Sequence, residues 1–222
     1  MTEYVISKKF ATRVERSDRV LEVAEAFGLG LNDKEFVLFD NLKLDIEPGD
    51  VVYITGQSGG GKTQLLKEIV SQMKTANLDV ANIDDVAFEE KPLVDQVGKS
   101  LREAINYFSL TGLNEGYLFI RKPSELSDGQ KYRFRLAKLI ESGAKVWVAD
   151  EFMAILDRDS AKGIAYNIQK VARSLGVTLI VATTHTDMIA DLAPTLYIEK
   201  RFREKLKVQK FEDGEYRCMV NV

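Results

Sequence analysis

The sequence predicts an α/β fold built on a mostly parallel central sheet. Three apolar runs read as strands buried on both faces, and each leads toward a segment with helical periodicity. These runs are Val51–Thr55, Val146–Ala149 and residues 178–182. Because strands that alternate with helices pair in parallel through crossover connections, this order indicates an α/β core. We expect an N-terminal antiparallel β subdomain before this parallel-sheet core, and a small helical subdomain at about residues 91–140.

Composition favours one compact domain over residues 1–222, with 45% hydrophobic residues available for a core. The net charge of -3 indicates neither a nucleic-acid partner nor a polybasic membrane signal. Cys218 is the only cysteine, which excludes an internal disulfide and fits a reducing compartment. No apolar run approaches the roughly 20 residues that span a bilayer, and the N-terminus does not read as a signal peptide. We therefore expect a cytoplasmic protein without a transmembrane segment.

The N-terminal third is expected to be mostly strand. Alternating apolar residues predict a first strand over residues 4–10, and a short helix follows over Asp18–Phe27. One apolar face of that helix is formed by Val20, Leu21, Val23, Ala24 and Phe27. Two further strands, at residues 35–39 and 42–46, lead into a turn at residues 48–50.

The middle of the chain is predicted to be mainly helical. Residues 78–88 have weak periodicity and can hold one or two short strands. Apolar residues recur at intervals of three and four over residues 94–108, which predicts one amphipathic helix, whereas residues 110–124 look irregular. A second helix starts after Ser127 or Asp128, either of which can cap it. Its apolar face carries Tyr132, Leu136, Leu139 and Ile140.

The C-terminal part alternates helices and strands. A helix over residues 159–175 stops at Gly176, and a short helix ends at Leu192. Three strands are expected at residues 196–198, 205–211 and 216–220, the last two joined by a turn at Asp213 and Gly214.

A glycine-rich segment between the first buried strand and its helix has the pattern of a phosphate-binding loop. It reads Gly56, Gln57, Ser58, Gly59, Gly60, Gly61, Lys62 and Thr63, and Gln64 follows. The glycines let successive backbone N–H groups point at an anion, and the helix N-terminus adds its positive dipole end. Lys62 supplies a mobile cation, and Thr63 offers a hydroxyl to Mg²⁺. The segment therefore predicts binding of nucleotide phosphates with Mg²⁺.

Two carboxylates and the only histidine follow the other two buried strands. Asp150 can hold Mg²⁺ through a coordinated water, and Glu151 can accept a proton from an attacking water. The alternative is a pair of surface acids at the end of a strand. His185 follows the strand at residues 178–182, at the sheet edge where ligands bind, and a neutral imidazole can hydrogen-bond a γ-phosphate. The alternative there is a purely structural histidine. The predicted catalytic groups are Lys62, Glu151 and His185.

Four further motifs, in order along the chain, resemble those of ABC-type ATPases. Leu126, Ser127, Asp128, Gly129 and Gln130 resemble the LSGGQ signature, with Asp in place of the first Gly. Residues 146–151 resemble the Walker B strand with its catalytic Glu, residues 154–157 the D-loop, and Thr184 with His185 the switch histidine. The resemblance spans about residues 35–200 and implies a P-loop NTPase fold of ABC type, which hydrolyses ATP with Mg²⁺.

The resemblance also implies a head-to-tail homodimer that forms on ATP binding. Each P-loop site would be completed by the signature of the opposite subunit, where the Ser127 hydroxyl and the Gly129 N–H contact the γ-phosphate. Asp128 and Gln130 complete that signature, and Asp157 of the D-loop would align the interface. Phe27 is the candidate for the aromatic that stacks on adenine. The alternative for Phe27 is a core position on an amphipathic helix.

Several positions depart from the family pattern. Gln64 stands where a second hydroxyl is usual, and Phe152 replaces the usual proline. The Q-loop, which couples to the membrane domain in transporters and helps to bind Mg²⁺, is represented by Gln96 as a candidate metal ligand, or by Glu89 or Glu90. Only 64 residues separate Lys62 from Ser127, fewer than in transporter subunits. These departures argue against a transporter.

The signature helix and the Walker B segment look closer to a soluble branch of prokaryotic and viral ABC ATPases, often fused to a predicted acetyltransferase domain. No such module fits in this chain, so an effector protein, such as an acetyltransferase-like partner, would be separate. We expect a soluble Mg²⁺-dependent ATPase that dimerises around ATP and drives a conformational change in that partner. The alternatives are the ATP-binding subunit of a membrane transporter and a nucleic-acid maintenance ATPase. The lack of heptads and of a basic stripe argues against the latter.

Overall fold

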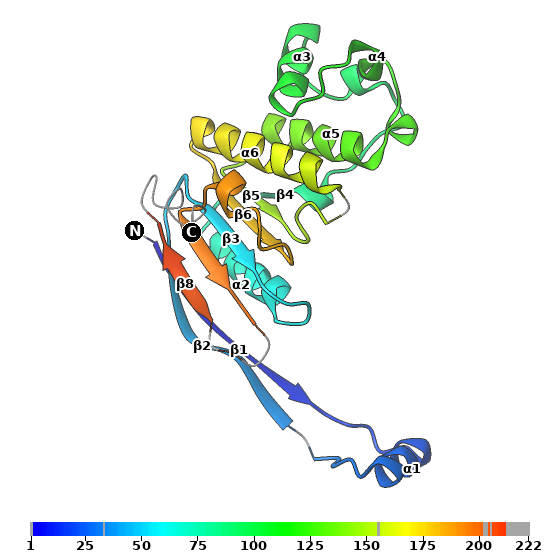
Figure 1. The fold of residues 1–222 in the computed structure, drawn as a ribbon, viewed down its shortest axis with the longest axis vertical. Helices are drawn as coiled ribbons and strands as arrows, with labels where there is room; N and C mark the ends of the chain where they lie inside the picture. The colour runs from blue at the N-terminus through cyan, green and yellow to red at the C-terminus, as the bar shows by residue number, and fades with distance from the viewer. Residues whose placement is uncertain (1, 33, 155, 202–203, 205, 212–222) are drawn as a thin grey trace. The chain divides into compact units, whose positions relative to one another are not determined.

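The structure is a computed structural model that describes residues 2–32, 34–154, 156–201, 204 and 206–211 (Figure 1). The chain divides into two compact units, one of which is Glu3–Asp45, while the other contains residues 1–2 and the chain from Ile46 onward. The α/β class is confirmed, with a two-stranded antiparallel sheet and a mostly parallel core sheet. One domain over residues 1–222 stays a prediction.

The smaller unit is a two-stranded sheet with a helix between its strands. The strands are β1 (Thr2–Thr12) and β2 (Lys34–Ile46). The prediction of two strands at residues 35–39 and 42–46 is wrong, because β2 is continuous. Asn41 adopts a left-handed φ of 48° within the strand, and its N–H donates to Ser7 Oγ on β1 at 3.0 Å. This geometry keeps β2 paired with β1 at the position where the sequence predicted a break between two strands.

The predicted helix α1 (Asp18–Phe27) has the expected bounds, but its apolar face is mostly not buried. Ser17 Oγ caps its N-terminus by accepting the Val20 N–H, and Gly28, with a φ of 61°, ends it. Of the predicted face only Ala24 is buried, whereas Leu21, Val23 and Phe27 are exposed. A core position for Phe27 is therefore excluded, since its side chain is 75% exposed.

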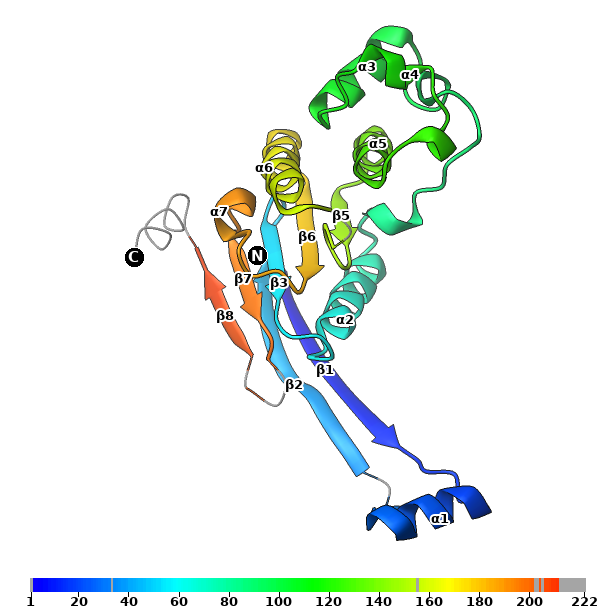
Figure 2. The same cartoon turned by 45° about the vertical axis from the view of Figure 1, so that its right-hand side comes forward.

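The larger unit contains a six-stranded sheet with the order β4-β5-β6-β3-β7-β8. Figure 2 labels the strands from β5 to β8 in this order. All neighbouring strands are parallel except β7 and β8, which are antiparallel. The strands are β3 (Val51–Thr55), β4 (Val80–Asn82), β5 (Val146–Ala149), β6 (Thr178–Thr183), β7 (Leu196–Glu199) and β8 (Lys207–Lys210). The glycine-rich loop thus leaves a central strand, and the carboxylates at residues 150 and 151 leave β5, two strands away.

Helices cover both faces of this sheet. Residues 51 and 53 of β3 share one hydrophobic cluster with α5 (Asp128–Glu141), α6 (Arg158–Leu175) and α7 (Ile189–Leu192). The intervening residues of β3 point to the opposite face, on which α2 (Lys62–Thr75) packs. Every residue of β3, β5 and β6 is buried, as expected for central strands covered on both sides.

A second hydrophobic cluster supports the helical subdomain predicted at residues 91–140. It brings together buried residues of α3 (Leu101–Leu110), α4 (Gly116–Phe119) and α5, with Leu93 from the 3₁₀ turn Leu93–Asp95. The helix predicted over residues 94–108 is wrong at its start, because Gly98 has a φ of 77° and Ser100 caps α3. Ala104 and Phe108 form the buried face of α3, while Leu101 and Ile105 are exposed. Two short 3₁₀ turns, Ile83–Asp85 and Pro123–Glu125, complete the elements.

No helix in the described ranges is long and apolar enough to cross a membrane. The strand predicted at residues 205–211 corresponds to β8. The strand predicted at residues 216–220 and the turn at Asp213 and Gly214 lie outside the described residues, as do Cys218 and Ile155 of the predicted D-loop.

Candidate functional site

The glycine-rich loop is held tightly between β3 and α2. Gly56 and Gly59 have φ angles of 139° and 73°, and the Gly60 N–H donates to the Gln57 carbonyl at 3.1 Å. Gly61 precedes α2 and has no side chain that could cap it. The first N–H groups of that helix are therefore free of a capping side chain, at the end of the helix that adjoins the loop. This is the arrangement that a phosphate group needs, with backbone donors and a helix N-terminus at one place.

Lys62 lies across this loop. Its Nζ donates to the carbonyl oxygens of Gly56 at 2.9 Å and Gln57 at 2.8 Å. Burial lowers the pKa of Lys62, and the nearby charges of Asp150 and Glu151 oppose that shift. A bound polyanion would favour the charged ammonium further. The lysine is thus placed to hold phosphate oxygens.

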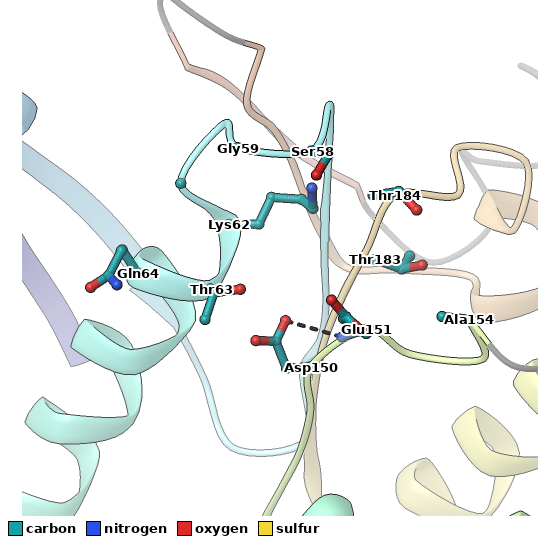
Figure 3. A pocket seen from close by; sticks show the side chains of 11 residues that line it. Ser58, Gly59, Lys62, Thr63, Gln64, Asp150, Glu151, Ala154, Thr183 and Thr184 are labelled. Atoms are coloured by element: carbon teal, nitrogen blue, oxygen red, sulfur yellow. Dashed lines mark hydrogen bonds between the residues drawn. The ribbon is translucent and has the colours of Figure 1, made fainter. Parts of the chain in front are cut away.

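A pocket of about 410 Å³ lies between the loop and the ends of β5 and β6. Figure 3 shows Lys62 and Thr63 on one side of this space, with Asp150 and Glu151 on the other. The lining residues are Ser58, Gly59, Gly61, Lys62, Thr63, Gln64, Asp150, Glu151, Ala154, Thr183 and Thr184. Sequence segments about 90 residues apart therefore meet at the carboxyl edge of the sheet, where ligands bind in such folds.

The two acids sit on an unusual turn. Asp150 follows β5, and its Oδ1 accepts the Glu151 N–H at 3.0 Å. Glu151 and Met153 both have left-handed φ angles, 48° and 61°. Phe152 between them is buried, and its N–H donates to the Ala182 carbonyl of β6 at 2.8 Å. A proline could not make this bond, so the departure at Phe152 gives the turn an attachment to β6.

The oxygen donors at this pocket fit Mg²⁺. Thr63 and Asp150 both line it. Proteins usually bind Mg²⁺ through one or two oxygen ligands of their own, such as a hydroxyl and a carboxylate, while phosphates and waters supply the remaining ligands. Within the described ranges no group of three His, Cys, Asp or Glu side chains could hold a metal alone. The site therefore suits a metal that arrives with phosphates.

His185 lies next to the pocket but is not among its lining residues. Thr183 and Thr184, which precede it, do line the pocket, although neither was among the predicted site residues. Burial and the positive charge of Arg158 lower the pKa of His185, which favours the neutral imidazole. Its predicted contact with a γ-phosphate stays a prediction.

A second cavity of about 330 Å³ shares Asp150, Glu151 and Ala154 with the first. Asp84, Tyr132 and Arg135 complete its lining. Burial raises the pKa of Asp84, and the Tyr132 hydroxyl is buried without a hydrogen-bond partner among the described residues. Sequence reasoning missed Asp84, although it follows β4, and the same edge-of-sheet rule that selected His185 would have found it.

Gln96 is not among the residues that line the pocket. The Gln96 side chain is bonded within its own turn, where its Oε1 accepts the Glu89 N–H and its Nε2 donates to the carbonyls of Glu89 and Lys91. The side chain of Glu90 accepts a bond from Ser124. The printed side-chain hydrogen bonds of Gln96 and Glu90 therefore do not involve the phosphate loop. Phe27 belongs to the smaller unit, and its contact with adenine stays a prediction.

The signature and D-loop residues begin two helices. Ser127 caps α5, accepting the Gln130 N–H at 3.3 Å while Gln130 Oε1 accepts the Ser127 N–H at 3.0 Å. Asp157 caps α6 by accepting the Ser160 N–H at 2.9 Å, which lowers the pKa of Asp157. The predicted functional residues thus have structural roles inside the chain as well.

Gly56→Ala is expected to destabilise the protein. A Cβ at this position would lie 1.9 Å from the Lys200 carbonyl oxygen, and a φ of 139° is strained for any other residue. Backbone strain of this kind costs about 1–3 kcal/mol before the clash is counted. Urea unfolding should show the loss. Gly163→Ala on α6 is the control, because a Cβ there meets nothing within 4 Å, and it should be neutral or stabilising. A Gly56→Ala midpoint at or above that of the unsubstituted chain would contradict this geometry.

Two solved structures resemble this fold. The ATP-binding cassette MJ0796 in a dimeric post-hydrolysis state bound to ADP and Pi has a TM-score of 0.64 at 15% identity, covering 95% of this chain and 99% of that one. The ADP conformation of the cassette MJ1267 has a TM-score of 0.62 at 16% identity, covering 82% and 88%. At these identities the likeness concerns the fold.

Curated relatives match at the level of sequence. The methionine import ATP-binding protein MetN of Corynebacterium diphtheriae is 26% identical over 193 residues, covering 72% of this chain and 57% of that protein. MetN of Helicobacter hepaticus is 26% identical over 192 residues, covering 71% and 54%. The chain spans just over half the length of these relatives.

A family model described as ABC transporter matches residues 39–154, which is more than half of the 222 residues. The chain therefore belongs to the ABC transporter family, whose ATPase domains bind ATP and hydrolyse it with Mg²⁺.

Proposed function

We propose that this chain is an ATP-driven homodimer in which two copies enclose ATP, and that each cycle of hydrolysis changes the conformation of a partner protein. The observation that carries this proposal is the pocket in which Lys62 and Thr63 face Asp150 and Glu151. Lys62 and the loop suit phosphates, Thr63 and Asp150 from opposite sides suit a metal, and Glu151 suits a water.

Each residue has a proposed part in the reaction. The loop N–H groups and Lys62 hold the phosphates, with Gln64 beside them, and Thr63 and Asp150 hold Mg²⁺, which when bound neutralises charge on the phosphates. Glu151 takes a proton from the water whose oxygen attacks the γ-phosphorus, as the bond to the bridging oxygen of ADP breaks. His185 hydrogen-bonds the γ-phosphate.

The dimer is supported by the state of the signature residues. The Ser127 oxygen accepts a bond inside the chain, but its O–H can still donate to a phosphate outside it, and the side chain is exposed. A Cβ on Gly129 would meet only Leu156, at an ordinary 3.6 Å, so packing among the described residues does not demand glycine there. A close approach by a second copy would. Asp157 is proposed to face the same interface.

Mixing two inactive variants tests the dimer. Ser127→Arg blocks the signature, and Lys62→Ala disables the phosphate loop, so each homodimer should be inactive. In a mixed dimer the intact loop of one chain meets the intact signature of the other, and one of two sites works. An equal mixture should recover roughly a quarter of the normal ATPase rate if the sites act independently.

The matched control replaces an exposed serine on α2, Ser71→Arg, which should be active alone. Full activity of Ser127→Arg by itself, or no recovery in the mixture, would exclude a site shared between copies. In either case each chain would have to build its own complete site.

A second candidate role is the ATP-binding subunit of a membrane import system. The names of the curated relatives, methionine import ATP-binding proteins, favour this role. The reported relatives do not support an acetyltransferase-like partner, so the partner in the first role is proposed only as an effector protein. A tagged Glu151→Gln chain, locked with ATP, should be recovered with an integral membrane protein in the second role and with a soluble protein in the first.

A further inference from the structure

β3 carries two buried hydroxyls on one face. Tyr53 and Thr55 are both 0% exposed, and since they are two residues apart in a strand, their side chains leave the same side of the sheet. Val51 on that side and the other members of the strand are apolar. A buried hydroxyl costs free energy unless it is hydrogen-bonded, so the partners of these two groups indicate what they do.

Both hydroxyls donate to the same oxygen, the main-chain carbonyl of His185. Thr55 Oγ1 lies 2.8 Å from it, and the Tyr53 hydroxyl bonds to it as well. A carbonyl oxygen has two lone pairs and can accept both bonds. The His185 N–H in turn donates to Thr183 Oγ1 at 3.3 Å. Both polar groups of the His185 main chain are therefore fixed, and the imidazole can move only by rotation of its own side chain.

A third contact holds the same loop, residues 184–188 between β6 and α7. The guanidinium of Arg158, the first residue of α6, pairs with the Asp187 carboxylate. Both side chains are about 40% exposed, and ion pairs in contact with water contribute little to stability. The buried hydroxyls are consequently the tighter attachment of this loop.

We propose that Tyr53 and Thr55 are positioning residues that hold His185 at the edge of the nucleotide pocket. Thr55 directly precedes Gly56, so the strand that presents the phosphate loop also fixes the loop that carries the histidine. Thr183 and Thr184 line the pocket immediately before His185, so the fixed main chain lies beside the pocket that is proposed to hold the phosphates. This inference rests on the proposed contact between His185 and the γ-phosphate.

Tyr53→Phe and Thr55→Val each remove one hydroxyl and keep the side-chain shape. Each should lower kcat roughly 3- to 10-fold, the effect of one lost hydrogen bond, while KM for ATP stays within about twofold because the phosphate loop is intact. Tyr197→Phe is the matched control. Its ring lies 5.6 Å from that of Tyr53 on the neighbouring strand β7, and this substitution should leave kcat unchanged.

The single histidine supplies a readout that does not depend on hydrolysis. Because the chain has one His, its imidazole protons give unique NMR signals. Tyr53→Phe and Thr55→Val should shift these signals, and Tyr197→Phe should shift them much less. If the signals and kcat are both unchanged in the two hydroxyl variants, the inference is overturned.

A double-mutant cycle separates positioning from general stability. In a His185→Ala background, Tyr53→Phe should lower kcat no further. An undiminished loss there would show that the hydroxyl acts on something other than the histidine and would overturn the inference. If His185→Ala alone keeps full kcat, the proposed role of His185 fails, while shifted imidazole signals in the hydroxyl variants would still support the attachment of its loop.

Discussion

Glu151→Gln is expected to bind ATP normally, to lose hydrolysis and to accumulate as a dimer. The amide keeps the size of the side chain but cannot accept the proton of the attacking water. Loss of a general base costs about 100- to 10,000-fold in kcat. Because ATP is not consumed, the state that it favours persists, and size-exclusion chromatography with ATP and Mg²⁺ should show the dimer.

The control for this substitution is Glu115→Gln, which removes the same charge from an exposed position before α4. It should hydrolyse ATP at the normal rate and should not accumulate as a dimer. A normal hydrolysis rate in Glu151→Gln would remove Glu151 from its role. A monomer with ATP bound would instead refute the dimer and leave the role of Glu151 in place.

Lys62→Ala is expected to lose most of its affinity for ATP. The ammonium is partly buried in the loop, where a phosphate would replace the carbonyls of Gly56 and Gln57 as its partners. Removal of one member of a buried charge pair costs about 2–5 kcal/mol, which corresponds to a loss of roughly 30-fold or more in affinity. Equilibrium titration with a fluorescent ATP analogue measures this loss directly.

Lys67→Ala removes an exposed lysine from the same helix and should bind ATP normally. The comparison therefore distinguishes the specific position of Lys62 from the general charge of α2. If Lys62→Ala and Lys67→Ala bind ATP equally well, the glycine-rich loop does not bind phosphates through this lysine.

Local sequence patterns were sufficient to predict an element where the residues concerned have one dominant structural role. The apolar runs before Gly56 and before Asp150 predicted strands whose bounds β3 and β5 reproduce, and Ser127, one of the two predicted caps, is the residue that caps α5. The start of α3 could not be predicted in this way, because periodicity over residues 94–108 continues through a left-handed Gly98 and the cap at Ser100. The break predicted between the strands at residues 35–39 and 42–46 is absent, and the Asn41 N–H donates to Ser7 Oγ on the neighbouring strand.

The sequence by itself determined the chemistry of this protein, since the phosphate loop, the paired acids and the histidine are recognisable from residue type and order. Only the tertiary structure decided which of these groups meet. Strand order placed β6 between β3 and β5, so Thr183 and Thr184 entered the pocket, whereas hydrogen bonds within its own turn held Gln96 elsewhere. The tertiary structure also revealed that Tyr53 and Thr55 bond to the His185 carbonyl, more than 100 residues away. Local sequence could not predict these bonds, since contacts between distant segments leave no local pattern.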